Sequence, residues 1–569
     1  MSDLFKQFIA SRGYTEEFLD SIENSEHKDL HNIDVLCKKL NDIQKSHKKL
    51  IVLPDFDMDG IMSGVVGFTG FAELGFEVEL FIPKPEFGYG FNKKTIDAME
   101  KEHENFSAVI TCDNGISAFE GVDYLKSKGI EVFITDHHMP QENYPKADVI
   151  VDPLCREDSY EHKAICGAHV MWQVLDYYAR HYCDEEKVRN ISLLRVFAGI
   201  GTVSDVMPVL YENRALLKDA ITICRLVSQL PEDDVNVEQL KCNIEQDKNF
   251  FNTLGFDSFP MRSVFEGLGK TICKFVFEGK ISKVSDIDEE FFGFYLAPMF
   301  NSLKRLDANI IIAFGAFFDE HPETYIDKLY ELNEQRKQLV NEYMLEIEEQ
   351  DNPYAPYIYI TNANSGVLGL LATKIMSKTK LPCFVVSKSE DSYGYSGSGR
   401  SPEWFLANSL LTNEGFYIAG HEHAFGCGFT DEKEIESLFA YLDKTISQMD
   451  IDKTVYYDYL IDTDKHDYSD CFDFIEISQF LKPFGVDFAK PEGLIHLSFS
   501  KNILAYKIMG SEDQHLKLIL SNEITVLLWN QAYLINDILD MVDFDVVGYL
   551  DVSEFAGRTQ VNFVGNIVD

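Results

Sequence analysis

The sequence has few basic residues, and this shortage limits what the protein can bind. It contains 51 Lys and Arg against 94 Asp and Glu in 569 residues, a net charge of −43 at pH 7. Such an acidic surface repels polyanions, which excludes strong non-specific binding to nucleic acid. If the protein binds a polyanion, it must use a local basic groove or bound metal ions.

The sequence also lacks the segments that mark export, membrane insertion and disulfide scaffolds. Residues 1–6 do not have the basic-then-apolar layout of a signal peptide. No apolar run approaches the roughly 18 residues of a membrane span. The 11 cysteines are odd in number and scattered, without a CxxC pair, which argues for reduced thiols and against a cysteine-type zinc site. We therefore expect a cytoplasmic protein with no membrane partner.

What the sequence does contain is the pattern of a multidomain α/β protein. Its length predicts about three or four domains. Short apolar runs alternate with helical stretches, which predicts a mostly parallel sheet with helices on both faces. The predicted strands are residues 49–53, 78–82, 108–112, 132–135 and 149–151, and the clearest helices between them are 60–74 and 118–128.

Changes in this pattern divide the rest of the chain. Residues 191–220 predict a further apolar helix and a turn at Gly201, and short apolar runs after about residue 450 predict a small β-barrel. The predicted domains are an N-terminal helical segment (1–45), an α/β domain (46–324) with a mixed, mainly helical insertion at about 215–290, a connecting amphipathic helix (325–350), a second α/β domain (351–448) and a barrel domain (449–569).

Acidic residues directly follow four of the predicted strands. The carboxyl ends of parallel strands line one crevice, so these side chains should meet there. Crowded carboxylates repel one another unless a cation lies between them. Mixed carboxylate and imidazole ligands suit Mn²⁺ or Mg²⁺ and can also take zinc or iron, and two such ions clamp a phosphate. The residues are Asp55, Asp57, Asp59, Asp113, Asp136, His137, His138 and Asp152, with Asp205 after a fifth apolar run.

Each of these signals also has a plainer interpretation. A single Asp after a strand is commonly a helix N-cap. Residues 55–60 fit the first half of an EF-hand loop, but Val66 stands where that loop needs a Glu. His421 and His423 would form a zinc site only with further ligands nearby. The coincidence of acids after five apolar runs with two adjacent histidines favours a metal centre over these separate explanations.

Taken in order, the motifs resemble those of the DHH phosphoesterase superfamily. They are Asp-x-Asp-x-Asp-Gly at 55–60, Asp-Asn-Gly at 113–115, Asp-His-His at 136–138 and the late Asp205. Further motifs, from about residue 30 to the end, resemble the RecJ-type single-strand-specific exonucleases of that superfamily. They include 81–83 with 88–90, 201–208, 296–298 with Asn301 and Arg305, 366–369, 397–401, Gly420 with His421, and 483–485.

This resemblance implies a fold and a role for each matched residue. The fold is α/β, with a parallel-sheet DHH domain, a long connector helix, a second α/β DHH-associated domain and a C-terminal OB-like β-barrel. One or two Mn²⁺ or Mg²⁺ ions would be held by Asp57, Asp59, Asp113, His137 and Asp205. The catalytic neighbours would be Asp55, Asp136 and His138, of which Asp136 would orient the histidine pair. DNA or phosphate would be bound by Asn301, Arg305, Ser398, Arg400, Gly420 and His421.

Several positions depart from the family pattern, and two of them are Leu53 and Lys304. Leu53 stands where many members carry a histidine ligand, and Lys304 stands where glycine is commoner. Neither departure removes one of the carboxylates named above.

The resemblance implies a metal-dependent exonuclease that degrades single-stranded DNA 5′ to 3′ to mononucleotides in DNA repair or recombination. It would be a monomer, with a single-strand-binding protein or a helicase as expected partners. Two alternatives stay open: a DHH phosphodiesterase for short oligonucleotides or cyclic dinucleotides, and a catalytically silent replication scaffold. The length and the predicted barrel speak against the first, and the retained metal-ligand residues against the second.

Overall fold

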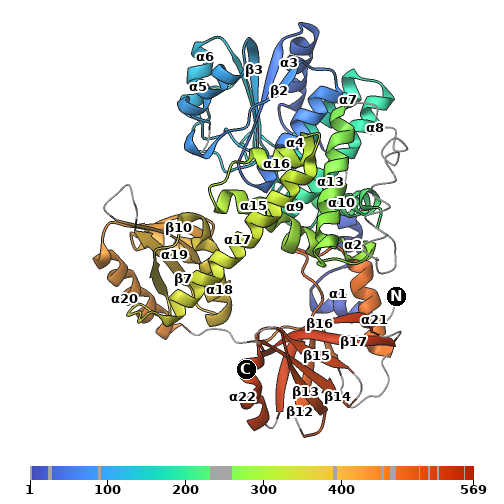
Figure 1. Cartoon of the computed structure of the whole chain (residues 1–569), viewed down its shortest axis with the longest axis vertical. Helices are drawn as coiled ribbons and strands as arrows, with labels where there is room; N and C mark the ends of the chain where they lie inside the picture. The colour runs from blue at the N-terminus through green and yellow to red at the C-terminus, as the bar shows by residue number, and fades with distance from the viewer. Residues whose placement is uncertain are drawn as a thin grey trace. The chain divides into compact units, whose positions relative to one another are not determined.

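The computed structural model (Figure 1) describes residues 3–23, 28–87, 91–230, 259–388, 394–449, 454–461, 469–498, 500–510, 513–521, 524–541, 543–555 and 558–568. The motif at 88–90 and residues 231–258 of the predicted insertion lie outside these ranges. The chain divides into two compact units. Unit 1 comprises residues 1–27, 208–215 and 453–569, and unit 2 comprises 28–207 and 216–452.

The first sheet of unit 2 is parallel throughout, which confirms the prediction from the alternating pattern. Its strand order is β2-β1-β3-β4-β5. Helices α5 and α6 cover one face, and α3, α4 and α7 cover the other (Figure 1). The strands are β1 (Lys49–Pro54), β2 (Val78–Leu80), β3 (Phe106–Cys112), β4 (Glu131–Thr135) and β5 (Val149–Val151). The covering helices are α3 (Ile33–Lys45), α4 (Met58–Glu73), α5 (Lys93–Glu102), α6 (Phe119–Ser127) and α7 (Gly167–Tyr182).

Burial on both faces explains why these strands are continuous apolar runs instead of alternating ones. In β1, Ile51 and Leu53 belong to a core cluster with residues of α5 and α6. Val52 points to the other face, where it lies against Gly67 of α4. Leu53 is only 2% exposed, so its side chain is committed to the core and offers nothing to a ligand.

The prediction of a turn at Gly201 is wrong. This residue lies inside helix α9 (Arg195–Ser204), which runs on to Asp205 as its C-cap. A Cβ atom at Gly201 would stand 2.4 Å from Asp59 Oδ1. The glycine is therefore required by the close approach of the helix to a buried carboxylate, and not by a change of chain direction.

The rest of unit 2 is a helical region followed by a second sheet. The helices are α8 (Glu185–Leu193), α10 (Tyr211–Ser228, which begins in unit 1), α13 (Phe259–Phe277), α14 (Glu289–Phe291), the π-helical turn η3 (Phe292–Leu296), α15 (Ala297–Arg305), α16 (Ile311–Phe318) and α17 (Pro322–Glu349). The predicted amphipathic helix at 325–350 is α17, whose apolar positions Ile326, Leu329 and Val340 are buried.

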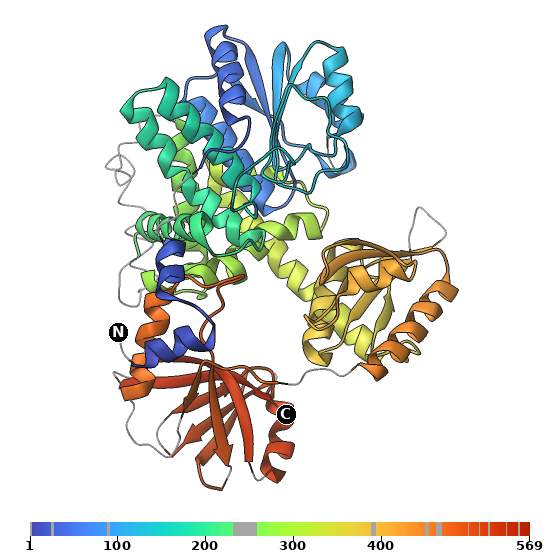
Figure 2. The same ribbon diagram turned by 180° about the vertical axis from the view of Figure 1, so that it is seen from behind.

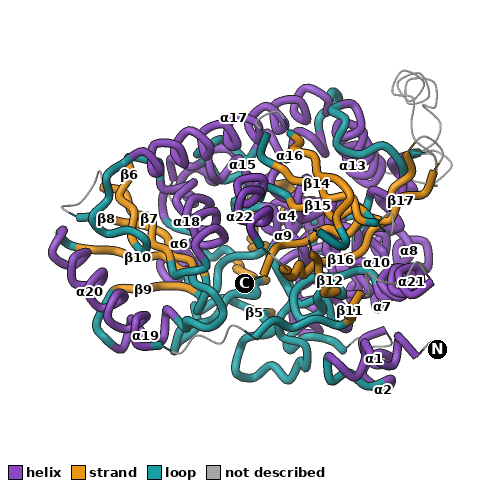
Figure 3. The backbone as a smooth tube through the Cα atoms, turned by 90° about the horizontal axis from the view of Figure 1, so that it is seen from below, coloured by secondary structure: helices purple, strands orange, loops and turns teal. Residues whose placement is uncertain are grey.

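The second sheet has the order β6-β7-β8-β10-β9, and only its β6–β7 pair is parallel. Helix α18 packs on β7 and β8, and α19 and α20 lie on the other side (Figure 3). The strands are β6 (Ile358–Thr361), β7 (Cys383–Lys388), β8 (Tyr395–Arg400), β9 (Tyr417–Gly420) and β10 (Ala424–Phe429), and the helices are α18 (Ser365–Thr379), α19 (Ala407–Asn413) and α20 (Glu432–Gln448). This confirms a second α/β layer structure.

Unit 1 combines a β-rich segment with the N-terminal helices. Its seven strands follow the order β11-β12-β16-β17-β15-β14-β13, and no pairing among the described residues joins β11 to β13 to close a ring. The β-rich prediction is thus confirmed without a visible closure of the barrel. The strands are β11 (Tyr459–Ile461), β12 (Gly493–Ser498), β13 (Ile503–Met509), β14 (His515–Leu520), β15 (Thr525–Leu528), β16 (Asp543–Phe555) and β17 (Arg558–Val568). The helices are α1 (Asp3–Ser11), α2 (Glu16–Glu23), α21 (Ser469–Leu481) and α22 (Ile535–Asp540).

A shared core joins the two ends of the chain within unit 1. Helix α1 lies beside α21 (Figure 2), and Phe5 and Phe8 share a buried cluster with Leu481 and Phe484. Arg214 reinforces this junction. Its guanidinium is 1% exposed, pairs with Glu23 at 2.7 Å and donates to the carbonyls of residues 481, 482 and 483 at 2.6–3.1 Å. No helix among the described residues is long and apolar enough to cross a membrane.

Replacing Arg214 with Ala should lower the free energy of unfolding of unit 1 by about 3 kcal/mol or more, because two buried carbonyls and a partly buried one would lose their donor. Arg180 is the matched control: its pair with Asp176 is partly exposed, so Arg180→Ala should cost at most about 1 kcal/mol. Denaturant unfolding followed by circular dichroism measures both. Equal, small effects of the two changes would contradict the role given to Arg214.

Candidate metal centre

The segment after β1 places three carboxylates where helix α4 begins. Asp57 is the N-cap of α4, and its Oδ1 accepts from the backbone N–H of Gly60 at 3.2 Å. Asp59, on the first turn, is 2% exposed and accepts from the N–H groups of Gly167 and Ala168 at 2.6 and 3.1 Å. The N-cap interpretation therefore holds for one oxygen of Asp57, and the start of α7 fixes Asp59.

Asp113 follows β3 and lies at the middle of the cluster. It is 2% exposed and has a positive φ of 64°, a conformation that aspartate tolerates better than most residues. Its Oδ1 is 2.9 Å from His137 Nε2, yet it forms no hydrogen bond of acceptable geometry with any described residue. A buried carboxylate oxygen without a donor is the feature expected where a cation is to be bound.

The residues after β4 form a fixed histidine pair. Asp136 Oδ1 accepts from the N–H of His137 at 2.8 Å and lies 2.7 Å from His138 Nδ1. Its Oδ2 accepts from the N–H of Ile116 at 2.9 Å. Every oxygen of Asp136 is thus used inside the protein, which fits the predicted orienting role and leaves His137 Nε2 directed at the carboxylates.

Asp205 reaches the same cluster from the end of a helix, within residues 191–220 where the sequence predicts an apolar helix. It caps the end of helix α9 instead of following a strand. Its Oδ2 is 3.6 Å from His137 Nε2, and Asp59 Oδ2 is 3.8 Å from the same nitrogen. Acids from strand ends are therefore joined by one from a helix end.

Within the described part of the chain, three sets of side chains have ligand atoms close enough to hold a metal ion, within 4.8 Å of one another. We call the set Asp55, Asp57 and Asp113 the Asp55 group, and the set Asp59, His137 and Asp205 the Asp59 group. The third set is Asp113, His137 and His138, which shares Asp113 with the Asp55 group and His137 with the Asp59 group. Oxygen and imidazole donors in this mixture suit Mn²⁺ or Mg²⁺.

The electrostatics of the cluster require compensation by cations. Burial, followed by the charges of Asp59, Asp57 and Asp55, raises the pKa of Asp113 well above its usual range. Burial raises the pKa of Asp55 and of Asp205 to about 7, with a further contribution from a neighbouring Asp in each case. The hydrogen bond to Asp136 raises the pKa of His138 to about 9. Without a metal ion, the cluster therefore binds protons, which reduce its negative charge.

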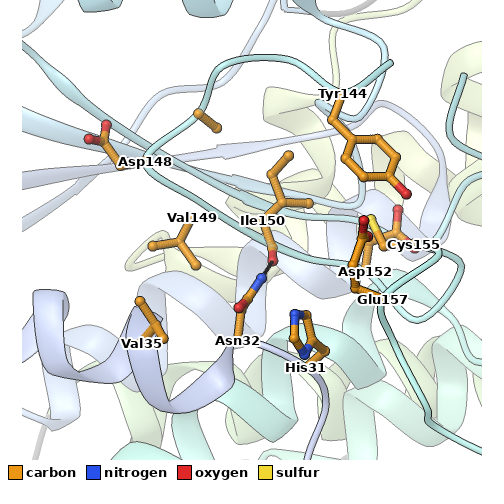
Figure 4. A pocket seen from close by; sticks show the side chains of 11 residues that line it. His31, Asn32, Val35, Tyr144, Asp148, Val149, Ile150, Asp152, Cys155 and Glu157 are labelled. Carbon is orange, nitrogen blue, oxygen red and sulfur yellow. Dashed lines mark hydrogen bonds between the residues drawn. The ribbon is translucent and has the colours of Figure 1, made fainter. Parts of the chain in front are cut away.

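Asp152, the last of the strand-end acids, belongs to none of the three ligand sets. Its Oδ1 accepts from the N–H of Leu154 at 2.7 Å, and its buried Oδ2 has no hydrogen-bond partner. It lines a separate cavity of about 300 Å³ together with His31, Tyr144 and Cys155 (Figure 4). The pattern of acidic strand ends therefore overcounts the ligands by two, because Asp136 is also outside the three sets.

The predicted DNA-binding residues include two arginines, Arg305 and Arg400, and residues at or near the ends of strands β8 and β9. Arg305 and Arg400 lie close enough for the charge of Arg305 to lower the pKa of Arg400, after the larger effect of burial. Neither arginine forms a salt bridge with a described residue. Ser398 lies on β8, two residues before Arg400. Gly420 ends β9 and is followed by His421. Strand β10 lies between β8 and β9, and its Ala424 pairs with Arg400.

Asn301, predicted to bind DNA or phosphate, contacts the protein backbone in this structure. Its Oδ1 accepts from the backbone N–H of Met58 at 2.9 Å, which ties helix α15 to the loop of Asp57. One turn later, Lys304 Nζ lies 3.1 Å from Asp57 Oδ2. Sequence reasoning noted Lys304 only as a departure from the family pattern and did not place it at the metal centre. Its position three residues after Asn301 was the available signal, because residues three apart share a helix face.

Arg336 of α17 is a further residue that the site prediction missed. It is held by the buried Asn333, whose Oδ1 accepts from its Nε and Nη2 at 3.1 and 2.9 Å. Burial, and then the charge of Arg305, lowers the pKa of Arg336. Arg305 thus lies near two other guanidinium groups, an arrangement that favours an anionic ligand.

Comparison with known proteins agrees with this architecture. A family model for the DHH family, N-terminal domain, matches residues 49–200, and one for the RecJ OB domain matches residues 463–565. The single-stranded-DNA-specific exonuclease RecJ of Haemophilus influenzae is 26% identical over 431 residues, 71% of this chain and 67% of that protein. The Bacillus subtilis RecJ is 25% identical over 90% of this chain, which spans only 60% of that relative.

Solved structures show the same fold. The crystal structure of RecJ from Thermus thermophilus in complex with Mn²⁺ superposes with a TM-score of 0.72 at 20% identity, covering 99% of this chain and 75% of that one. The Mg²⁺ complex of the same protein gives a TM-score of 0.68 at 19% identity, covering 100% of this chain and 74% of that one.

Metal-free protein should become less stable as the pH rises from about 5 to 8. Asp55 and Asp205 have pKa values of about 7 in the folded chain, against about 3.9 for an unfolded aspartate. Because the folded state holds these protons more tightly, this stabilisation is full below about pH 4 and is lost as the pH rises through 7. Thermal unfolding of the EDTA-treated chain measures the decline.

Two further measurements sharpen this test. Added Mn²⁺ should raise the unfolding midpoint more at the higher pH, since metal binding needs ionised carboxylates. Asp55→Asn removes one of the titrating groups and should flatten the pH dependence of the metal-free chain. A variant with the same slope as the wild type would show that the decline arises elsewhere.

Proposed function

We propose, from the premise that this chain is a RecJ-like member of the DHH family, that it is a metal-dependent nuclease that degrades single-stranded DNA from 5′ to 3′. Mononucleotides are the proposed product, and DNA repair or recombination the proposed setting. The observation that carries this is the combination of a carboxylate and histidine cluster at the sheet ends with a RecJ OB domain in one chain. The polarity and the product follow from the likeness to RecJ.

The proposed cofactor is Mn²⁺ or Mg²⁺. The buried, partnerless Oδ1 of Asp113 and the mixed oxygen and imidazole donors fit such an ion. Asp57, Asp59, Asp113, His137 and Asp205 would hold one or two such ions. When bound, a divalent ion lowers the pKa of water and neutralises charge that develops on a phosphate.

The side chains around this site have their own tasks. His138, with its raised pKa, would carry a proton and face a phosphate oxygen, while Asp136 keeps its ring in place through Nδ1. Asp55 would complete the carboxylate set beside Asp57. No covalent intermediate with the protein is required, because a water molecule can attack phosphorus in line.

The cations near Arg305 would bind the backbone of the substrate. A Cβ at Gly366, in the first turn of α18, would stand 2.2 Å from the carbonyl oxygen of Arg305, and Gly369 lies against the Arg400 guanidinium. The N-terminus of α18 is therefore packed against these arginines. A helix N-terminus beside guanidinium groups attracts phosphate. With a net charge of −43, repulsion elsewhere on the surface would confine the polyanion to this region.

Each alternative function lacks the support that the nuclease has. A phosphodiesterase for dinucleotides needs no OB domain, whereas one is matched at residues 463–565. A silent scaffold would not need the paired ligand sets, which are assembled from residues far apart in the sequence. We further propose single-stranded DNA as the binding partner, with a single-strand-binding protein or a helicase as associated proteins, a monomeric state and a cytoplasmic location.

The direct test uses 5′-labelled and 3′-labelled 30-mers, single-stranded and duplex, with Mn²⁺, Mg²⁺ or EDTA. The proposal expects labelled mononucleotide at once from the 5′-labelled single strand, only with metal. Hydrolysis of dinucleotides but of no 30-mer would favour the small-substrate alternative. No cleavage of either substrate would favour the scaffold.

Asp113→Ala should nearly abolish turnover while single-strand binding persists. Asp113 lies in two of the three ligand sets, so its loss should cost more than the roughly 10–100-fold typical of losing an outer partner of a metal ligand. Rates with the labelled single strand and affinities from fluorescence anisotropy measure the two effects. A near-normal rate would refute the assignment of Asp113.

Arg400→Ala should weaken binding of single-stranded DNA about 10-fold or more, since one charge-assisted hydrogen bond to phosphate is lost. Metal content should not change, because Arg400 is in none of the ligand sets. Lys378 provides the control: it pairs with Glu348 on the surface of the same unit, and Lys378→Ala should bind DNA like the wild type. Unchanged affinity of the Arg400 variant would remove this residue from the interface.

A further inference from the structure

The Asp55 group and the Asp59 group differ in how their negative charge is balanced. In the Asp55 group, Lys304 Nζ lies 3.1 Å from Asp57 Oδ2, and the charge of Lys304 also acts on Asp55. In the Asp59 group, neither Asp59 nor Asp205 forms a salt bridge with a Lys or Arg of the described chain, and each is paired only with His137. One ligand set thus has a permanent cation beside it and the other has none.

The fold places Lys304 at this point. It lies in the last turn of α15, three residues after Asn301, and the same helix face therefore carries both side chains. Asn301 anchors that face to the backbone N–H of Met58, next to Asp57. The partners are only partly exposed, 41% for the Lys304 side chain and 32% for that of Asp57. The pair is thus a consequence of how α15 docks on the loop.

A second feature weakens the Asp55 group as a metal site. Leu53, two residues before Asp55, is buried in the hydrophobic core between β1 and the helices α5 and α6. No imidazole can join the carboxylates from that position. The Asp55 group therefore consists of carboxylates alone, with an ammonium already paired to one of them.

We propose that Lys304 acts as a built-in cation for the Asp55 group, so that the chain binds one divalent ion tightly at the Asp59 group and a second one only weakly. An ammonium close to Asp57 reduces the attraction that this carboxylate offers to a divalent ion. The identity of the metal ion in this proposal rests on the proposed function. It assigns Lys304 as a positioning residue that sets the metal stoichiometry of the site.

The test counts Mn²⁺ ions on the full-length chain without DNA. Equilibrium dialysis of the EDTA-treated protein gives stoichiometry and affinity, and electron paramagnetic resonance shows whether two Mn²⁺ ions are coupled. The wild type should bind one ion tightly and show no coupled signal at one equivalent. In Lys304→Met, the second ion should bind at least about 10-fold more tightly than in the wild type and give a coupled spectrum.

Two further variants separate this role from a structural one. Lys304→Arg keeps the positive charge and should retain the wild-type binding curve. Adding Asp57→Asn to Lys304→Met should remove the second ion again and leave the first. Circular dichroism of each variant checks that the fold is kept.

Two outcomes would overturn the inference: two ions of equal affinity in the wild type, or a Lys304→Met curve that matches the wild type. Because these measurements use no DNA, they are independent of nuclease activity. A one-ion curve together with no cleavage of any labelled strand would refute the proposed function while the assignment of Lys304 stands.

Discussion

Repulsion among buried carboxylates is the constraint on which the rest of this structure depends. Asp55, Asp59 and Asp113 are each about 2% exposed and lie within one small volume. A fold that only minimised its own free energy would separate them, because each charge loses its hydration on burial. The protein instead fixes them with the N–H groups of α7, the N-cap of α4 and the histidine pair. The negative charge of this arrangement must be balanced by positive charge, which protons, Lys304 or divalent ions can supply.

The parallel sheet makes that concentration of charge possible. Strands β1, β3 and β4 end at the same edge and deliver Asp55, Asp113 and Asp136 there. Two glycines then allow helices to approach the carboxylates: Gly167 next to Asp113 and Gly201 next to Asp59, where a Cβ would stand 2.4 Å away in each case. The close packing of α7 and α9 on this edge buries Asp59 and Asp113, and it brings Asp205 to His137.

A second group of charges, of the opposite sign, lies within the same unit. Arg305, Arg336 and Arg400 come from α15, α17 and β8 and none is neutralised by a salt bridge among the described residues. Helix α15 links the two groups, since it carries Asn301 and Lys304 toward Asp57 and ends at Arg305. A phosphate bound by these arginines would therefore be linked to the carboxylate cluster through one short helix.

The sequence by itself determined the layers and most of the ligands. Short apolar runs that alternate with helical stretches indicate parallel strands covered on both faces. Acids directly after such strands gather at one edge, so Asp55, Asp57, Asp59, Asp113 and His137 could be predicted together. Only the tertiary structure decided which acids belong to the set. Asp152 obeys the same local rule but lines another cavity, while Asp205 comes from a helix end. Lys304 and Arg336 reach their places through helix docking, which depends on long-range packing that no local pattern encodes.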